Sequence, residues 1–348
     1  MRLPCEHAGM TATETSLPFA ELTPHVVLDA LSDVGLRGDG RLLQLNSYEN
    51  RVFQVSLEDG TTVVAKFYRP GRWSDAQILE EHAFANELAL AEIPVVAPLV
   101  LRVEAQAQDI RCLGEPPTLA LRESLRFSAA PRCAGRAPEL DDPDTLERIG
   151  RFIGRMHVVG ARNDFAVRRP LDVQTLGWSP RDWLIEHERV TAAALPAWSA
   201  TSRQALDIAS ERLASQGGVR RLRVHGDCHP GNLLWSSAGP HFVDLDDATT
   251  APAVQDLWML LSGDPLESRR QLAALLEGYE DFLEFDRREL ALIEPLRTLR
   301  MVHHSAWLAQ RFSDPAFAIG FPWFGTAAYW AEQTQYLQTQ IELMNTPS

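Results

Sequence analysis

The residues best suited to catalysis lie between positions 221 and 247, where polar side chains follow short apolar runs. Asp227 comes after one such run, Asn232 follows a Pro-Gly turn, and Asp244 ends a further run. Apolar runs separated by Pro, Gly and Ser turns predict strands joined by a loop and a hairpin. Such elements end where these three side chains can converge. Two carboxylates and one carboxamide supply only oxygen ligands, which suits a hard cation such as Mg²⁺ together with substrate phosphates.

The same pattern predicts phosphoryl transfer, a reaction in which the protein mainly positions groups and neutralises charge. In that chemistry an Asp of the catalytic loop accepts the proton of the attacking hydroxyl, and a following Asn and Asp hold the metal against the phosphates. We therefore interpret Asp227 as the proton acceptor, Asn232 as a metal ligand, and Asp244 as a catalytic residue that also binds metal. Asp246 is an additional candidate ligand. The two nearby histidines of this loop are expected to brace it by hydrogen bonds rather than bind metal.

Lys66 is the only lysine among 33 basic residues, and it lies in a β-branched run that predicts a strand. Lysine is a compact charge on a slim stem, whereas arginine presents a broad planar fork. We therefore interpret Lys66 as a ligand of nucleotide phosphates; the alternative is a neutral strand position. The helix predicted over residues 74–91 offers Glu80, Glu81 and Glu87 as partners for this lysine, and we favour Glu81 because it lies beside the apolar stripe.

The turn over residues 46–50, Asn-Ser-Tyr-Glu-Asn, lies one hairpin before Lys66. A protein kinase has a Gly-rich loop over the ATP phosphates at this place, and this sequence has none. Backbone amides, Ser47 and Asn50 would have to contact the phosphates instead. The composition alone is that of an ordinary hairpin turn, so only the position of the turn favours a binding role.

Strand patterns precede helical patterns along the chain, which predicts an α+β fold. A capped helix is predicted after Thr23, an antiparallel hairpin system over residues 42–68, and strands at 119–121 and 125–127. Residues 129–144 have the composition of a linker. Helices are predicted over 142–161, 180–194, 199–214 and 254–263, and from 265 to the end the pattern is almost wholly helical.

Nine stretches resemble one bacterial kinase family, and they occur in order along nearly the whole chain. They are LNSYENRV (45–52), KFYRP (66–70), QILEEH (77–82), GRMH (154–157), HGDCHPGNLLW (225–235), FVDLDDA (242–248), PAVQDLWMLL (252–261), IEPLR (293–297) and DPAF (314–317). The catalytic stretch resembles the aminoglycoside-phosphotransferase-like kinases, and the full set resembles their stress response kinase A subgroup. The resemblance implies a two-lobed, protein-kinase-like fold with a small antiparallel-sheet N-lobe and a large, mainly helical C-lobe. We place an N-terminal extension at 1–20, the N-lobe at 21–130 and the C-lobe at 131–348.

The resemblance further implies a cytoplasmic, monomeric protein serine/threonine kinase that uses ATP and Mg²⁺, acts on Ser or Thr of a protein substrate and supports stress survival. In such kinases an Asp at the position of Asp256 braces the catalytic loop; the alternative is a helix N-terminal acid favoured by the macrodipole. His157 is expected to be a packing residue. The aromatic C-terminal third is expected to be a helical core; alternatively, some of its rings line the acceptor side together with Arg300 or Arg311.

Three other functions compete with a protein kinase. A small-molecule phosphotransferase of the same fold would act on an amino alcohol, a sugar or an aminoglycoside. A metallophosphoesterase is suggested by the Gly-Asp-Cys-His fragment at 226–229, but the other histidines are not arranged for it. A nucleotide-binding scaffold without turnover is disfavoured because Lys66, Asp227, Asn232 and Asp244 are all present.

Composition sets the remaining limits. The chain has 348 residues, 45% of them hydrophobic and 23% charged, enough for two lobes. It has no apolar run of about 18 residues, so no membrane partner is expected, and its start lacks the apolar core of a secretion signal. A formal net charge of −14 argues against nucleic-acid binding. Four cysteines without CxxC spacing favour a reducing cytoplasm.

Overall fold

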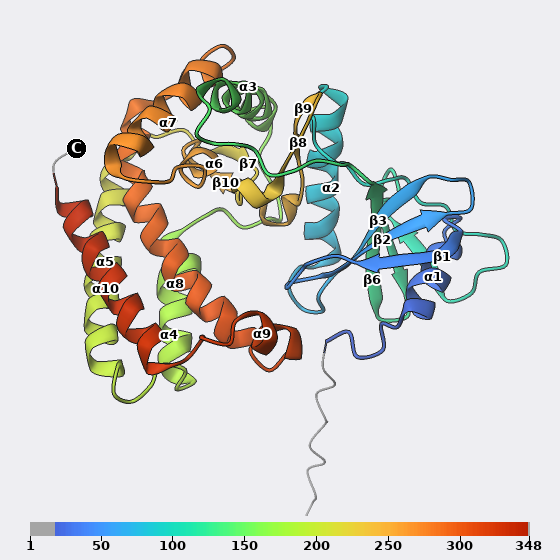
Figure 1. Cartoon of the computed structure of the whole chain (residues 1–348), viewed down its shortest axis with the longest axis horizontal. Helices are drawn as coiled ribbons and strands as arrows, with labels where there is room; N and C mark the ends of the chain where they lie inside the picture. Colours follow the sequence, from blue (N-terminus) through green and yellow to red (C-terminus); the bar gives the residue numbers. More distant parts are fainter. Residues whose placement is uncertain (1–17, 347–348) are drawn as a thin grey trace, which may run out of the picture.

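A computed structural model describes residues 18–346 of the chain. The predicted N-terminal extension, residues 1–20, therefore lies almost entirely outside the described residues. An antiparallel sheet with two helices is followed by a mainly helical region, so the predicted α+β arrangement of a sheet region and a helical region is confirmed (Figure 1). Within the described part of the chain, no helix is long and apolar enough to cross a membrane.

Six strands form the N-terminal sheet in the order β1-β2-β3-β6-β5-β4, and every pair is antiparallel. Their bounds are β1 Gly38–Gln44, β2 Arg51–Leu57, β3 Thr62–Phe67, β4 Ile110–Leu113, β5 Leu119–Arg122 and β6 Leu125–Pro131. Side chains alternate between the two faces of a strand. Ala65 and Phe67 are fully buried in the core of this region, so Lys66 between them points to the opposite face.

Helices α1 (Pro24–Ser32) and α2 (Asp75–Leu90) belong to the sheet region, and both begin where the sequence predicts. Thr23 caps α1 with its side chain, and Ser74 forms a capping box with Gln77 at the start of α2. Helix α1 packs against the sheet, whereas α2 lies between the sheet and the helical region (Figure 1). Helix α2 therefore carries its buried acid toward the junction of the two regions.

The helical region contains α3 Pro143–Gly160, α4 Ser179–Glu186, α5 Leu195–Ser215, α6 Gln255–Trp258, α7 Pro265–Tyr279, α8 Ile293–Arg311, α9 Pro315–Gly320 and α10 Ala327–Asn345. Two short antiparallel pairs interrupt it, β7 (Leu222–Val224) with β10 (Thr249–Ala251) and β8 (Leu233–Ser236) with β9 (Gly239–Phe242). The helix predicted over 254–263 is only the single turn α6. The residues from Val254 to Leu260 are almost all buried, so tertiary packing rather than an amphipathic helix shapes this segment.

Two helices in the helical region approach each other closely because glycine lines their contact. A Cβ atom at Gly150 of α3 would lie 1.9 Å from the carbonyl oxygen of Leu275 in α7. A Cβ atom at Gly278 of α7 would likewise lie 1.9 Å from the carbonyl oxygen of Glu147 in α3. No side chain larger than hydrogen fits at either position without displacing backbone. This tight pair forms one wall of the core that supports the catalytic loop.

Main-chain contacts of the β8–β9 hairpin join the two regions. Arg136, just after the sheet, exchanges backbone hydrogen bonds with Trp235 of β8 at 3.0 and 2.6 Å. Val96 donates its backbone N–H to the carbonyl of Phe242 at 3.0 Å. A Cβ at Gly135 would lie 2.8 Å from the backbone of Leu234, so glycine permits the close approach. The hairpin that precedes Asp244 is thus held by both regions.

Candidate active site

One cavity of about 840 Å³ lies between the sheet region and the helical region. Its size is that of a small-molecule or cofactor site. Every predicted site residue lines it: Ser47, Asn50, Lys66, Glu81, Asp227, Asn232 and Asp244. These residues come from the β1–β2 turn, β3, α2, the loop after β7 and the loop after β9, so the tertiary fold brings five separate segments to one place.

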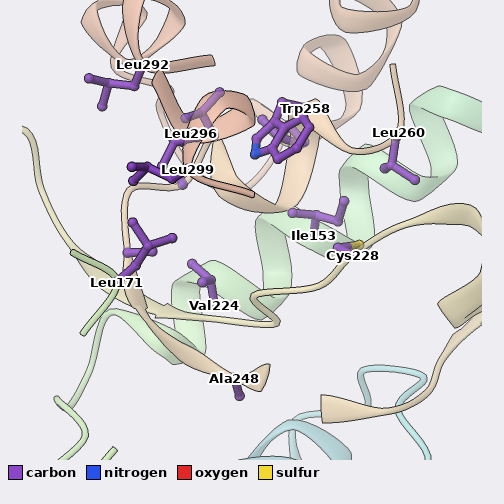
Figure 2. Packing of buried hydrophobic residues seen from close by; sticks show 14 of the residues in the cluster. Ile153, Leu171, Val224, Cys228, Ala248, Trp258, Leu260, Leu292, Leu296 and Leu299 are labelled. Carbon is purple, nitrogen blue, oxygen red and sulfur yellow. The ribbon is translucent and has the colours of Figure 1, made fainter. Parts of the chain in front are cut away.

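The loop that carries Asp227 emerges from strand β7, whose three residues are buried. Gly226 follows with a φ of +84°, and a Cβ there would lie 2.1 Å from the carbonyl oxygen of Asp247, so only glycine fits this turn. Figure 2 shows Val224 and Cys228 on either side of the turn, among apolar side chains such as Ile153. The apolar anchors of the loop point into the core, and Asp227 between them lines the cavity.

Asp256 of α6 holds the start of this loop. Its two carboxylate oxygens accept the backbone N–H groups of His225 at 2.7 Å and Gly226 at 2.8 Å. The buried His157 lies 3.0 Å from the same carboxylate and 3.0 Å from the hydroxyl of Tyr279. These are the bracing contacts that the family resemblance implied for Asp256, and His157 is a packed core residue whose two ring nitrogens are both satisfied.

Asp227 lies among groups that favour its charged form. Its Oδ1 is 2.6 Å from an Arg300 guanidinium nitrogen, and its Oδ2 is 3.5 Å from His229 Nε2. Asn232 Nδ2 donates to the backbone carbonyl of Asp227 at 3.0 Å. Burial raises the pKa of Asp227, but the hydrogen bond from His229 and the charge of Arg300 outweigh burial and hold that pKa below its usual range. The side chain is therefore a carboxylate that can accept a hydrogen bond from a hydroxyl.

Asp244 and Asn232 present the oxygen atoms that a cation needs. Asp244 adopts a left-handed conformation, with φ of 60°, at the start of the short turn Leu245–Asp247, and its side chain is half exposed. Its Oδ2 and the Oδ1 of Asn232 accept no hydrogen bond from any of residues 18–346. Within that range, no group of three His, Cys, Asp or Glu side chains could hold a metal. Two open oxygens fit a hard cation that takes its other ligands from phosphate and water.

Lys66 reaches across the junction to the acids after β9. Its Nζ is 2.7 Å from Asp244 Oδ1 and 2.9 Å from the buried Asp246 Oδ1. Although burial lowers it, these two carboxylates raise the pKa of Lys66 well above its usual value. Asp246 also lies 3.7 Å from Arg72. Both carboxylate oxygens of Asp246 therefore have partners within the protein, and its role as an additional metal ligand stays a prediction.

The predicted ion pair between Lys66 and Glu81 is wrong for this structure. Among the described residues, the carboxylates within 4.0 Å of Lys66 Nζ are those of Asp244 and Asp246. Glu81 is buried in α2 beside the cavity, where burial raises its pKa to about 7 and the charge of Lys66 opposes that rise only in part. The lysine points from β3 toward the helical region, so the acids after β9 reach it before the helix acid does.

Ser47 and Asn50 of the turn 46–50 line the cavity, and their contact with phosphates stays a prediction. Asn50 Nδ2 donates to Asp246 Oδ2 at 2.5 Å, and its Oδ1 accepts the backbone N–H of Arg69 at 3.1 Å. Ser47 Oγ donates to the Asn50 carbonyl at 3.0 Å. Both side chains therefore hold the turn in shape and line the cavity while their polar atoms serve partners within the protein.

Two walls of the cavity were not among the predicted site residues. The segment 130–135, the end of β6 and the residues that follow it, lines one side, and only its linker composition signalled it. On the other side, α8 contributes Arg300, His303, His304 and Trp307, which follow the spacing of a single helix face. The interpretation that placed aromatic rings and Arg300 beside the acceptor was the less favoured one, and the structure puts these side chains in the cavity.

The fold and the site define a kinase-like phosphotransferase. The profile of the phosphotransferase enzyme family matches residues 41–293, and the chain belongs to that family. It is 42% identical over 338 residues to stress response kinase A of Escherichia coli (strain K12), covering 96% of this chain and 97% of that protein. It is 40% identical over 334 residues to the serine/threonine protein kinase RdoA of Salmonella typhimurium (strain LT2), with the same two coverages. The predicted resemblance to stress response kinase A is confirmed.

Solved structures share the fold at low sequence identity. An amicoumacin kinase, in complex with AMP-PNP, Ca²⁺ and amicoumacin, superposes with a TM-score of 0.66 at 18% identity, covering 92% of this chain and 93% of that one. A microcompartment-associated aminopropanol kinase has a TM-score of 0.66 at 17% identity, covering 92% and 96%. These likenesses confirm the two-lobed kinase fold expected for the aminoglycoside-phosphotransferase-like superfamily.

Proposed function

We propose that this protein is an ATP- and Mg²⁺-dependent serine/threonine protein kinase of the cytoplasm that acts as a monomer in stress response. The observation that carries the proposal is the convergence of Lys66, Asp227, Asn232 and Asp244 on one cavity. A lysine from the sheet thereby faces the acids and the amide of the helical region, the arrangement of a phosphoryl-transfer site.

Each residue has a role that its position supports. Lys66 would bind nucleotide phosphates, because its ammonium already bridges the two acids of the Asp-Leu-Asp segment. Asn232 and Asp244 would hold Mg²⁺, which supplies charge neutralisation at the phosphates when bound. Asp227 would orient a Ser or Thr hydroxyl and accept its proton, since its carboxylate lines the cavity and stays ionised.

Two observations support a protein acceptor. One relative, at 40% identity, is named a serine/threonine protein kinase, whereas the small-molecule kinases are less than 20% identical and argue for fold alone. Along α8, all of which is described, the side chains that line the cavity are Arg300, His303, His304 and Trp307, and none is acidic. A polyamine acceptor such as an aminoglycoside would need carboxylates on this wall.

A small-molecule phosphotransferase is the second candidate. It stays a candidate because the shared fold also serves small-molecule kinases: an amicoumacin kinase and an aminopropanol kinase both superpose over 92% of the chain. The two candidates predict different acceptors for the same transferred phosphoryl group, so one assay separates them.

The test is incubation of the full chain with labelled ATP and Mg²⁺, together with a generic protein substrate or a panel of amino alcohols, sugars and aminoglycosides. Asp227→Asn serves as the inactive variant, and Asp164→Asn, at an exposed aspartate outside the cavity, as the matched control. Label should enter Ser or Thr of the protein in the wild type and in the control only. Transfer to a metabolite with none to protein would establish the second candidate, and no transfer to either would overturn both.

A further inference from the structure

The turn 46–50, which lines the cavity over the expected phosphate position, is bound to Asp314 at the start of α9. Asp314, the N-cap of α9, lies 2.9 Å from an Arg51 guanidinium nitrogen and 3.0 Å from one of Arg69. Arg51 opens β2 directly after the turn 46–50, and Arg69 follows β3. All three side chains are at most 12% exposed, so these ion pairs are shielded from water and screened little by salt.

A second carboxylate continues this network from the turn itself. Glu49 lies 3.1 Å from Arg69 Nε and 2.7 Å from Arg311 Nε, the last residue of α8. It also accepts the indole N–H of Trp307 at 2.5 Å. Arg69 is thus shared between Glu49 on the turn and Asp314 on α9. We call Glu49, Arg51, Arg69, Arg311 and Asp314 the turn–α9 network.

Aromatic packing reinforces the network. The ring of Tyr48 lies 5.7 Å from that of Phe317 and 4.7 Å from that of Phe321 between centroids. A Cβ at Gly320 would lie 2.6 Å from the Tyr48 ring, so this glycine permits the contact. Arg69 also donates to the backbone carbonyls of Tyr48 at 3.1 Å and Glu49 at 2.8 Å. In Figure 1, α9 lies next to the loop that joins β1 and β2.

The network determines where the turn sits. The turn contains no glycine, and the side chains of Ser47, Glu49 and Asn50 are all engaged by protein partners. Backbone amides are therefore what the turn can offer a phosphate, and their position follows from the contacts with α8 and α9. The turn also reaches Asp246 through Asn50, and Asp246 holds Lys66. Displacing the turn would thus disturb the lysine as well.

We propose that Asp314 is a positioning residue for the nucleotide: through Arg51 and Arg69 it holds the turn 46–50 in its phosphate-binding place. Contacts with the C-terminal segment 314–321 then hold the turn in place, whereas a Gly-rich loop is held by its own contacts with phosphate. The inference rests on the proposed function, because it assumes that nucleotide occupies this cavity. It assigns nucleotide affinity in part to residues more than 240 positions away from the turn.

The experiment replaces Asp314 with Asn. Asparagine still caps α9, where Asp314 Oδ1 accepts the Ala316 N–H at 3.1 Å, but it removes the charge that pairs with both arginines. We expect KM for ATP and Kd for AMP-PNP to rise about tenfold, with KM for the protein substrate changed less than twofold. Asp264→Asn is the matched control, because Asp264 caps α7 in the same way and is outside the cavity.

A second pair of variants separates positioning from folding. Gly320→Ala presses on the Tyr48 ring without changing a charge, and it should raise the same Kd while thermal unfolding shows an intact fold. Arg51→Gln combined with Asp314→Asn should cost less than the sum of the single changes, because both remove one interaction. The inference would be overturned if the folded Asp314 and Gly320 variants kept the wild-type Kd for AMP-PNP. It would also be overturned if KM for ATP and KM for the protein substrate rose equally. A wild type that transfers no phosphate would instead refute the proposed function, while Kd still tests Asp314.

Discussion

Replacing Lys66 with Met tests the centre of the site. Lys66 lies 2.9 Å from Asp246, whose side chain is only 4% exposed. Removing one partner of a buried ion pair costs about 3–5 kcal/mol, because the other charge stays buried without compensation. Here Asn50 still donates to Asp246, and Arg72 remains 3.7 Å away. We therefore expect a loss of about 2–3 kcal/mol of unfolding free energy, at or below the lower end of that range. At roughly 2 °C per kcal/mol in a chain of this size, Tm should fall by about 4–6 °C.

A second substitution separates stability from catalysis. In the Lys66→Met background, Asp246→Asn removes the stranded charge, so it should recover at least half of the lost unfolding free energy. Phosphotransfer should fall about 10²- to 10³-fold in the single variant, as for loss of one charge-stabilising donor. It should not recover in the double variant, because no ammonium faces the phosphates.

The measurements are urea unfolding, thermal unfolding and single-turnover transfer from labelled ATP. Arg136→Met is the control, since Arg136 pairs with Glu139 on the surface with both side chains at least 69% exposed. It should leave Tm unchanged. The reasoning is refuted if Lys66→Met keeps wild-type stability, or if Asp246→Asn destabilises the Lys66→Met protein further.

Three further predictions concern the loop, a buried acid and the metal. Asp256→Asn weakens the acceptor for the amides of His225 and Gly226, so kcat should fall about 10- to 100-fold with KM for ATP unchanged in steady-state assays; a parallel rise in KM would contradict the bracing role. Burial raises the pKa of Glu81 to about 7 from 4.5, so the folded chain binds a proton that the unfolded chain has lost. The unfolding free energy should therefore fall as the pH rises from 4.5 to about 7. Urea titrations at each pH measure this dependence, and Glu81→Gln should remove its part of the slope of unfolding free energy against pH. An unchanged slope would show that Glu81 does not titrate there. EDTA should abolish transfer, and Asn232→Ala should raise the Mg²⁺ concentration for half-maximal rate about tenfold; an unaltered Mg²⁺ midpoint would exclude Asn232 as a ligand.

Local sequence signals predicted much of the fold because their physics is local. Thr23 and Ser74 mark the starts of α1 and α2, since a side-chain oxygen satisfies an N–H of the first turn. The apolar and polar alternation of residues 51–57 predicts a strand with one buried face. Sheet followed by helices then determines the fold class. By contrast, the helix predicted over 254–263 is a single turn, because burial from every side removes the amphipathic pattern on which such predictions depend.

The sequence by itself also determined which residues could perform the chemistry: a lone lysine on a strand, and Asp227, Asn232 and Asp244 at element ends. Only the tertiary structure decided which charges meet. Lys66 contacts acids about 180 positions away rather than Glu81, and Arg51 and Arg69 meet Asp314 across separations of 263 and 245 positions. Ion pairs have no periodic signature in a sequence, and their strength depends on burial, which follows from the packing of distant elements. The partners of Lys66 and the turn–α9 network therefore became visible only when the two regions were placed together.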